Sequence, residues 1–149
     1  MQYIASAHEA TGCFLCEHQG IEDEAESLIL ARTDRAFVIL NAYPYNPGHL
    51  LVAPARHVGD LEALDAEELA DVSSLIQRAL RALREAAEPH GFNLGMNLGR
   101  VAGAGVPDHV HWHIVPRWNG DTNYMPIVGE TRVLPELLSE TYAKLKPKF

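Results

Sequence analysis

The sequence predicts an α+β fold in which an antiparallel sheet of about five strands packs against one long helix, with a second helix towards the C-terminus. Short apolar runs bounded by turn-forming residues recur along the chain, which is typical of strands. One longer segment after Asp65 instead repeats its apolar residues every three or four positions, which is typical of an amphipathic helix. A chain of 149 residues has the size of a single domain, so both patterns are expected to share one core.

The first three expected strands precede the helix. Apolar residues at 27–31 and 36–40 flank a charged turn at 32–35, which indicates a β-hairpin. Residues 41–48 are rich in Pro, Asn, Tyr and Gly. Because proline removes a backbone donor and glycine permits unusual dihedrals, this segment is expected to be a loop. It leads into a third apolar run, residues 49–54, which a proline ends.

The long helix is expected to begin after Asp65, whose carboxylate can accept from the free N–H groups of the first turn. Glu68 can complete a capping box three residues later, and Pro89 with Gly91 marks the end of the helix. Its apolar residues form one continuous stripe, so we interpret the helix as scaffold for the core. The stripe consists of Leu69, Val72, Ile76, Leu80 and Leu83.

Two more strands and a closing helix are expected after the long helix. Residues 92–98 alternate between apolar and polar side chains, residues 99–107 form a glycine-rich loop, and residues 109–116 resume a strict alternation. Residues 133–145 have helical spacing. These segments complete the predicted five strands and two helices.

The composition restricts the classes of function. An apolar fraction of 47% and a charged fraction of 21% are ordinary for a globular protein. A net charge of −8 argues against a general grip on nucleic acid, which needs a surplus of Lys and Arg. No apolar run reaches the roughly 20 residues of a membrane span, and the N-terminus lacks an export pattern. We expect a cytoplasmic protein without nucleic-acid or membrane partners, built as one domain with an N-terminal arm (residues 1–20) and a C-terminal extension (residues 119–149).

Three alternating histidines, His109, His111 and His113, are the strongest functional signal in the chain. On a strand they would share one face at spacings of about 7 Å, while the residues between them point into the core. Imidazole titrates near neutral pH, so such a row suits proton transfer, metal binding or attack on phosphorus. A solvated strand face would more often carry Thr, Lys or Glu.

Two functional interpretations of the histidines stay open at this point. The histidines could gather a metal ion, because catalytic zinc sites often use three protein ligands. They could instead face a phosphate, because residues 99–105 contain glycines that let backbone N–H groups converge on an anion. The second interpretation places an imidazole beside a phosphate, where it can attack.

Residues 109–115 resemble the signature of the histidine triad (HIT) family of nucleotide hydrolases and transferases, which is His-x-His-x-His followed by two apolar residues. Asn41, and His49 eight residues later, resemble the ribose-binding strand of that family and its accessory histidine. The resemblance covers about residues 13–118. Residues 116–121 are similar to the branch that handles diadenosine polyphosphates, which includes bacterial diadenosine tetraphosphate phosphorylases and hydrolases.

The resemblance implies a role for each histidine. His111 would attack the α-phosphorus and become nucleotidylated, His113 would contact the phosphate, His49 would support the hydrogen bonds of the triad, and His109 would complete it. Many relatives place Gln or Ser before the first histidine, and such a side chain can contact the leaving group. Residues 105–108 here are Gly-Val-Pro-Asp, which differ from that pattern and leave backbone N–H groups as the donors. The implied substrate contacts are Asn41 for the ribose, Phe37 or Leu40 for the base, Asn97 and the backbone of Gly103, Gly105 and Val106 for phosphate, and Trp118 for stacking on a base.

Cys13 and Cys16 are the two cysteines of the chain, spaced as Cys-x-x-Cys. In a cytosolic protein this spacing more often binds a metal or does redox chemistry than forms a structural disulfide. The resemblance implies a structural zinc ion that joins both cysteines to His57 and His109, a ligand set that is ordinary for zinc. Magnesium would accompany the polyphosphate of the substrate.

The expected function is nucleotidyl transfer from a dinucleoside polyphosphate, such as diadenosine tetraphosphate, through a nucleotidyl-histidine intermediate. Water or inorganic phosphate would be the acceptor, and the sequence does not distinguish them. One alternative is an adenosine phosphoramidate hydrolase of the same family, and another is a nucleotide-binding sensor without turnover. The resemblance also implies a homodimer.

Overall fold

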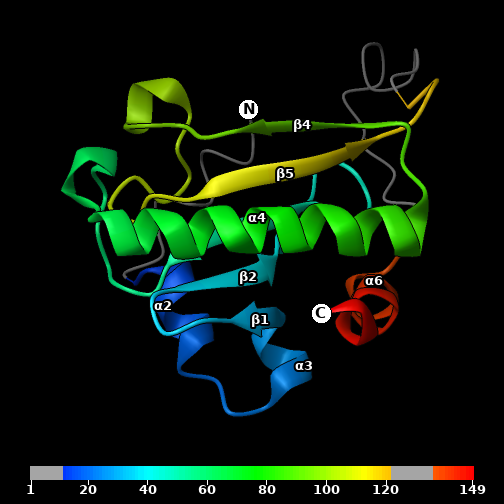
Figure 1. Ribbon diagram of the computed structural model, residues 1–149, viewed down its shortest axis with the longest axis horizontal. Helices are drawn as coiled ribbons and strands as arrows, with labels where there is room; N and C mark the ends of the chain where they lie inside the picture. The colour runs from blue at the N-terminus through cyan, green and yellow to red at the C-terminus, as the bar shows by residue number, and fades with distance from the viewer. Residues whose placement is uncertain (1–11, 122–135) are drawn as a thin grey trace.

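The computed structural model describes residues 12–121 and 136–149. In these residues a five-stranded antiparallel sheet is covered on one face by a long helix, α4 (Ala66–Ala87), as Figure 1 shows. The strand order is β1-β2-β3-β5-β4, and all four pairings are antiparallel. The predicted α+β class is therefore confirmed. The strands are β1 (Ile29–Arg32), β2 (Ala36–Leu40), β3 (Leu50–Pro54), β4 (Gly91–Gly95) and β5 (Trp112–Arg117).

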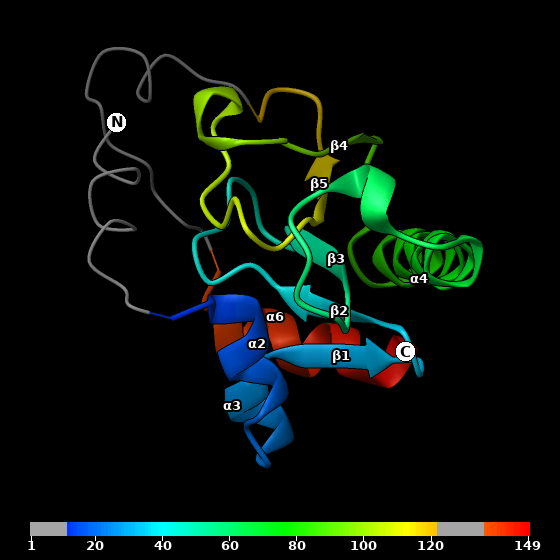
Figure 2. The same cartoon turned by 90° about the vertical axis from the view of Figure 1, so that its left-hand side faces the viewer.

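The helix α4 and the N-terminal helix α2 (Phe14–Gln19) lie on opposite faces of the sheet (Figure 2). None of the helices in the described ranges combines the length and the apolar composition that crossing a bilayer requires. The remaining helical elements are α3 (Glu24–Ser27), α6 (Leu138–Leu145) and the short 3-10 turns η1 (Leu61–Ala63), η2 (Arg100–Ala102) and η3 (Lys146–Lys148).

The strand β2 is buried on both faces, which divides the core into two clusters. Val38 and Leu40 belong to the cluster beneath α4, while Phe37 and Ile39 belong to the cluster that includes Leu15 of α2. Successive side chains of a strand point to opposite faces, so this one strand supplies both clusters. Burial on both faces explains why its sequence is a continuous apolar run.

Within the N-terminal arm (residues 1–20), Phe14–Gln19 form the helix α2, which the sequence did not predict. A helix of six residues is marginal by itself, and its N-cap, Cys13, makes no side-chain capping bond. Leu15 is completely buried in the cluster with Phe37. Contacts with residues distant in the sequence therefore stabilise this helix. Residues 1–11 lie outside the described ranges.

Three predicted boundaries also differ. Leu28 has a left-handed φ of 58° as the C-cap of α3, so β1 starts at Ile29 instead of residue 27. The strand β4 stops at Gly95, short of residue 98. The helix α6 starts at Leu138, and residues 133–135 of the predicted closing helix lie outside the described ranges.

The strand β5 starts at Trp112, so His109 and His111 precede the strand that was predicted to carry them. The reason is a change of partner: the Val110 N–H donates to the Val58 carbonyl at 2.7 Å, in the connection after β3, instead of to a neighbouring strand. From Trp112 onward β5 lies between β3 and β4 and pairs with both.

The helix α4 begins with the predicted capping box. The Asp65 carboxylate accepts from the Glu68 N–H at 2.8 Å, and the Glu68 carboxylate accepts from the Asp65 N–H at 3.0 Å. Arg56 donates two further hydrogen bonds to Glu68, at 2.9 and 2.8 Å. The buried carboxylate of Glu68 thus connects the start of α4 to the segment that follows β3 through hydrogen bonds.

We expect Glu68→Gln to destabilise the fold by about 1–2 kcal/mol at neutral pH, since it removes a charged partner of two hydrogen bonds. The Arg56 hydrogen bond and then the Asp65 backbone lower the pKa of Glu68 from 4.5 to about 2. The folded pKa is the lower one, so this contribution is present above pH 4.5 and lost as the pH falls towards 2. Urea unfolding of Glu68→Gln and of the unmodified protein from pH 7 to pH 3 measures how this contribution to stability changes. Arg56 is half exposed (52%), which keeps the expected effect modest.

The matched control is Glu62→Gln, an exposed carboxylate in η1. Its free energy of unfolding should follow that of the unmodified protein at every pH. A gap between Glu68→Gln and the unmodified protein that stays constant down to pH 3 would contradict the assignment.

Candidate active site and metal centre

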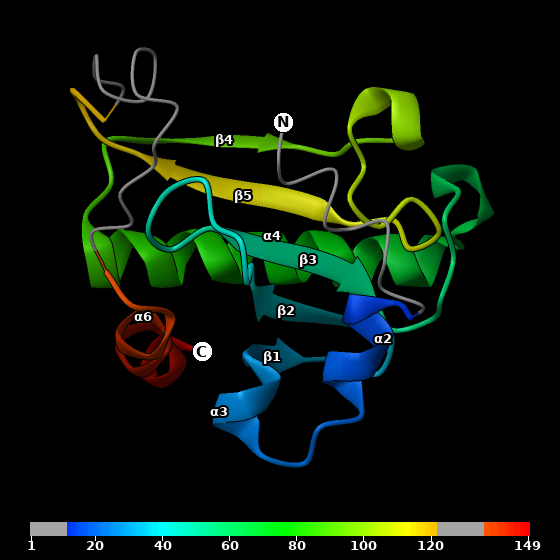
Figure 3. The same ribbon diagram turned by 180° about the vertical axis from the view of Figure 1, so that it is seen from behind.

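A pocket of about 500 Å³ lies beside the start of β5, between α2, the loop 41–48 and the loop after η2. The pocket lies on the face of the sheet away from α4, because Leu15 and Leu51, which line it, belong to the core cluster on that face. Figure 3 shows the sheet from this side. The predicted catalytic and substrate-binding residues that line the pocket are Asn41, Gly103, Gly105, Val106, His111 and His113.

His111 is held in one tautomer. Its Nδ1 lies 2.8 Å from the His109 carbonyl oxygen, which can only accept, so Nδ1 carries the proton and Nε2 keeps its lone pair. Among the residues that the structure describes, none forms a hydrogen bond with Nε2. Every fully buried side-chain nitrogen in the described residues has one, so Nε2 must be accessible from the pocket. Burial lowers the pKa of His111, which favours the neutral ring.

His113 receives its orientation from His49. The Tyr45 backbone N–H donates to Nδ1 of His49 at 3.0 Å, so Nε2 of His49 carries the proton and donates to Nδ1 of His113 at 2.9 Å. Nε2 of His113 is then the protonated nitrogen, and His113 lines the pocket. Burial, and then the neighbouring His111, lowers the pKa of His113 to about 4. The chain of bonds makes His113 a neutral donor at physiological pH.

Tyr45 is a site residue that the sequence did not reveal. Its ring stacks on that of His113, with centroids 5.9 Å apart and an interplanar angle of 16°, and contacts the ring of His49 at 4.6 Å. Tyr43 also lines the pocket, and its N–H donates to the Asn41 side-chain oxygen at 3.0 Å. The sequence showed both tyrosines in a loop next to Asn41, but a loop has no periodicity from which to predict where they point.

Phe37 and Leu40, the expected contacts for the base, do not reach the pocket. Each is only 1% exposed, and they belong to the two core clusters on opposite faces of β2. Both faces of this strand are covered, so neither side chain can offer a surface to a nucleotide. These two assignments are corrected to core residues.

Asn97 and Trp118 are also placed elsewhere. The Asn97 amide donates to the Gly103 carbonyl at 3.3 Å, so it supports the glycine loop instead of lining the pocket. The Trp118 indole donates to the Ala87 carbonyl at 3.3 Å and lines a separate cavity near the end of α4. Neither side chain lines the pocket that contains His111.

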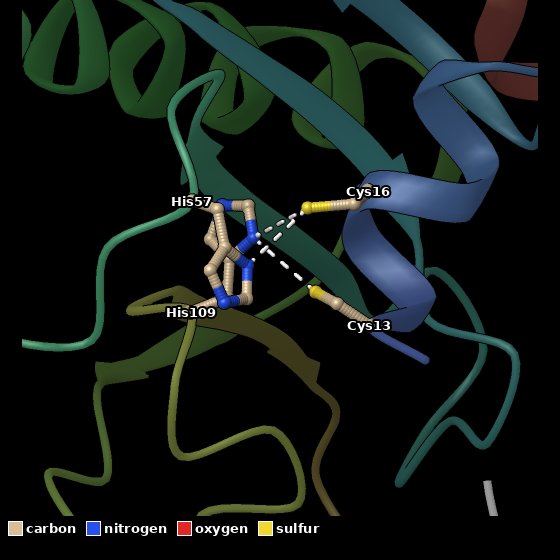
Figure 4. Close-up of side chains that lie close together, drawn as sticks. All are labelled: Cys13, Cys16, His57 and His109. Atoms are coloured by element: carbon tan, nitrogen blue, oxygen red, sulfur yellow. Dashed lines mark hydrogen bonds between the residues drawn. The ribbon is translucent and has the colours of Figure 1, made fainter. Parts of the chain in front are cut away.

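Cys13, Cys16, His57 and His109 point toward one another, as Figure 4 shows. Two of them, Cys13 and His57, also line the pocket. One ligand atom from each lies within 4.8 Å of the others. Cys13 Sγ is 3.4 Å from Nδ1 of His109, and Cys16 Sγ is 3.3 Å from Nδ1 of His57. In the part of the chain that the structure describes, this is the one group of three or more such side chains that could hold a metal ion.

The geometry of this cluster fits a tetrahedral ion. Around zinc, with bonds of about 2.3 Å to sulfur and 2.0 Å to nitrogen, neighbouring sulfur and nitrogen ligands lie about 3.5 Å apart. His109 also has the arrangement of a metal ligand, because its Nε2 donates to the Pro54 carbonyl at 2.8 Å and leaves Nδ1 free to coordinate. Burial and then Cys13 raise the pKa of the Cys16 thiol to about 11, and a coordinated cation reverses such a shift because it binds the thiolate.

His109 connects the cluster to the pocket. Its ring belongs to the metal cluster, whereas its carbonyl oxygen accepts the hydrogen bond that fixes the tautomer of His111. The ring is completely buried, and its other nitrogen is bonded to the end of β3. A movement of this one residue would therefore affect both sites.

The chain is similar to proteins of known family. A protein named AP-4-A phosphorylase from Mycobacterium tuberculosis is 46% identical over 121 residues, which cover 81% of this chain and 62% of that protein. The match thus spans about three fifths of that relative. An adenosine 5'-monophosphoramidase of Schizosaccharomyces pombe is 32% identical over 72% of this chain and 75% of its own.

A solved structure extends the similarity to nearly the whole chain. A zinc-bound histidine triad family protein from Mycobacterium smegmatis superposes with a TM-score of 0.71 and is 28% identical, over 95% of this chain and 94% of its own. The family model described as HIT domain matches residues 22–120. This match spans the loop 41–48, α4, the glycine loop and all three alternating histidines, so the chain belongs to the HIT domain family.

Proposed function

We propose that this protein transfers a nucleotidyl group from a dinucleoside polyphosphate, with diadenosine tetraphosphate as the substrate, through a covalent bond to His111. The observation that carries the proposal is the accessible, unprotonated Nε2 of a neutral His111, facing a pocket lined by a glycine loop. The similarity to the AP-4-A phosphorylase of Mycobacterium tuberculosis supports the choice of substrate.

The chemistry takes two steps. In the first, the lone pair on Nε2 of His111 attacks the α-phosphorus, and the P–O bond to the remaining phosphates breaks, so that ATP leaves with the electron pair. The imidazole then carries a positive charge, which the bond from Nδ1 to the His109 carbonyl stabilises. In the second step inorganic phosphate or water attacks the phosphorus. The N–P bond breaks, and its electron pair returns to Nε2; an attacking water loses its proton to solvent.

The other pocket residues would bind the oxygens of the α-phosphate while negative charge develops on them in the transition state. The Nε2–H of His113 can donate to a non-bridging oxygen, and so can the backbone N–H groups of Gly105 and Val106, which line the same pocket. The Gly103 N–H already donates to the Arg100 carbonyl. Asn41 lines the pocket near these groups and would take the ribose hydroxyls. Fixed donors of this kind need no rearrangement when the phosphorus is attacked.

We infer that zinc occupies the cluster of Cys13, Cys16, His57 and His109, in a structural role. The tetrahedral spacing of the ligand atoms and the zinc-bound relative from Mycobacterium smegmatis support this inference. Zinc would join α2 to the segments after β3 and before β5. Thiolate and imidazole ligands do not suit magnesium, which prefers oxygen, so magnesium remains a prediction tied to the phosphates of the substrate. The homodimer and the cytoplasmic location likewise remain predictions.

A second candidate function is hydrolysis of adenosine phosphoramidates. The similarity to the monophosphoramidase of Schizosaccharomyces pombe favours it, and the same attack by His111 would serve. The two functions differ only in the group that leaves. A comparison of kcat/KM for diadenosine tetraphosphate and for adenosine phosphoramidate separates them.

The decisive experiment incubates the protein with diadenosine tetraphosphate, with and without inorganic phosphate, and identifies the products by mass. We expect ADP and ATP when phosphate is the acceptor, and AMP with ATP when water is. ADP as the sole product without added phosphate would contradict attack on the α-phosphorus. Tight binding of nucleotide without turnover of either candidate substrate would contradict the proposal and indicate a nucleotide-binding sensor instead.

A further inference from the structure

We propose that Arg100 binds the phosphates beyond the α-phosphate and thereby makes the pocket selective for polyphosphate leaving groups. The inference rests on the proposed function, because it concerns the part of the substrate that departs after attack by His111. Arg100 lines the same pocket as His111 and His113.

The backbone of the glycine loop brings Arg100 to the pocket. Gly99 and Gly103 flank η2 with φ values of 80° and 92°, a conformation that side chains with a Cβ rarely adopt. The Gly103 N–H donates to the Arg100 carbonyl at 3.0 Å, which closes the turn. The loop lies at the same end of the sheet as α2 (Figure 3). The Arg100 side chain thus projects from a fixed turn at the rim of the site.

The guanidinium of Arg100 is available for a ligand. It is exposed and makes no hydrogen bond or ion pair with any residue that the structure describes, whereas Arg35 and Arg56 are paired with Glu67 and Glu68. It is also the one Lys or Arg among the described residues that line the pocket. A cation that has no partner among the described residues, beside a glycine loop that lines the pocket, suits a polyanion.

The rest of the loop offers backbone N–H donors to a polyphosphate but no positively charged side chain. Gly103, Gly105, Val106 and Pro107 line the pocket without any side-chain donor. Asp108 and Glu17 line it as carboxylates, which repel phosphate. The chain as a whole carries a net charge of −8. A leaving group with several negative charges would therefore enter against repulsion unless Arg100 compensates it.

A guanidinium suits this task because its planar fork can donate two hydrogen bonds to one phosphate, with a charge that does not titrate in the physiological range. The phosphates that leave after attack on diadenosine tetraphosphate gain negative charge as the P–O bond breaks, so Arg100 would act on binding and on leaving-group departure. The amine released from adenosine phosphoramidate presents no phosphate to Arg100. The selectivity between the two substrates should therefore depend on this side chain.

The test compares Arg100→Ala and Arg100→Lys with the unmodified protein on both substrates, with and without magnesium. We expect Arg100→Ala to lower kcat/KM for diadenosine tetraphosphate by about 10- to 100-fold and to leave that for adenosine phosphoramidate within about twofold, with partial recovery in Arg100→Lys. The matched control is Arg81→Ala, an exposed arginine on α4 that lines neither cavity, and it should change neither value.

An equal loss on both substrates would show that Arg100 supports the loop instead of contacting the departing phosphates. Unchanged kinetics would also overturn the proposal. Calorimetric binding of ATP and AMP gives a measure that does not depend on turnover. Arg100→Ala should weaken ATP but not AMP, even if neither substrate is cleaved and the proposed function fails. Equal affinities of the unmodified protein for ATP and AMP would contradict a phosphate contact at Arg100.

Discussion

His111→Asn is expected to abolish turnover of diadenosine tetraphosphate while nucleotide binding stays largely intact. An asparagine amide can still donate to the His109 carbonyl, as Nδ1 of His111 does, but no nitrogen then carries a lone pair towards the α-phosphorus. Loss of a covalent nucleophile lowers kcat by about 10⁴-fold or more. Steady-state kinetics, calorimetric titration with ADP and mass spectrometry of the nucleotidylated protein measure the three parts of this prediction.

The control for this variant is His90→Asn. His90 is exposed, and its Nδ1 accepts from the Asn119 N–H, so an asparagine there should leave activity unchanged. Full activity in His111→Asn, or a covalent adduct that survives the change, would reject His111 as the nucleophile. A loss of ADP binding as large as the loss of turnover would point to collapse of the pocket instead.

Replacing both cysteines, Cys13→Ser with Cys16→Ser, should release the zinc ion proposed for this site and cause the largest loss of stability among the variants described. The two thiolates are half of the ligand set, and the site closes a long loop because His109 lies 96 residues after Cys13. By analogy with removal of a covalent cross-link, we expect a loss of roughly 3–5 kcal/mol, which lowers Tm by about 10 °C or more. Metal analysis and thermal unfolding of both proteins check this.

A strong chelator provides the matched test on the unmodified protein, which covers the case in which the double variant does not fold. Chelation should lower Tm towards that of the variant, and added zinc should restore it. A lack of stoichiometric metal in the purified protein and in the variant alike would remove the zinc assignment. A chelator that leaves Tm unchanged in metal-loaded protein would show that the cluster does not stabilise the fold.

The sequence predicted those parts of the fold that local chemistry determines. The capping box of Asp65 and Glu68 and the end of α4 before Pro89 involve residues close in sequence, and β2 spans the predicted residues 36–40. The helix α2 could not be predicted, because its stability comes from the burial of Leu15 against a distant strand. Contacts of that kind leave no period in the sequence.

The candidate site was predictable to a similar extent. Alternation indicated that the histidines face one way, and the family resemblance proposed the four metal ligands, but the spacing of Cys13 and Cys16 alone did not identify His57. Phe37 and Leu40 were misplaced because alternation does not tell whether either face of a strand is open. Tyr45 and Arg100 were missed because loops position side chains through hydrogen bonds and glycine dihedrals instead of a repeating pattern.

The pairing of β5 on both edges limits how this protein can change in length. His113 lies opposite Leu51 on one side and Gly95 on the other. A residue added in a connection between strands leaves the register of β5 unchanged, but a residue added within β5 would exchange its two faces. Trp112 and Ile114 would then turn towards the pocket, and His113 would move beneath α4. The register of β5 therefore excludes an added residue within this strand.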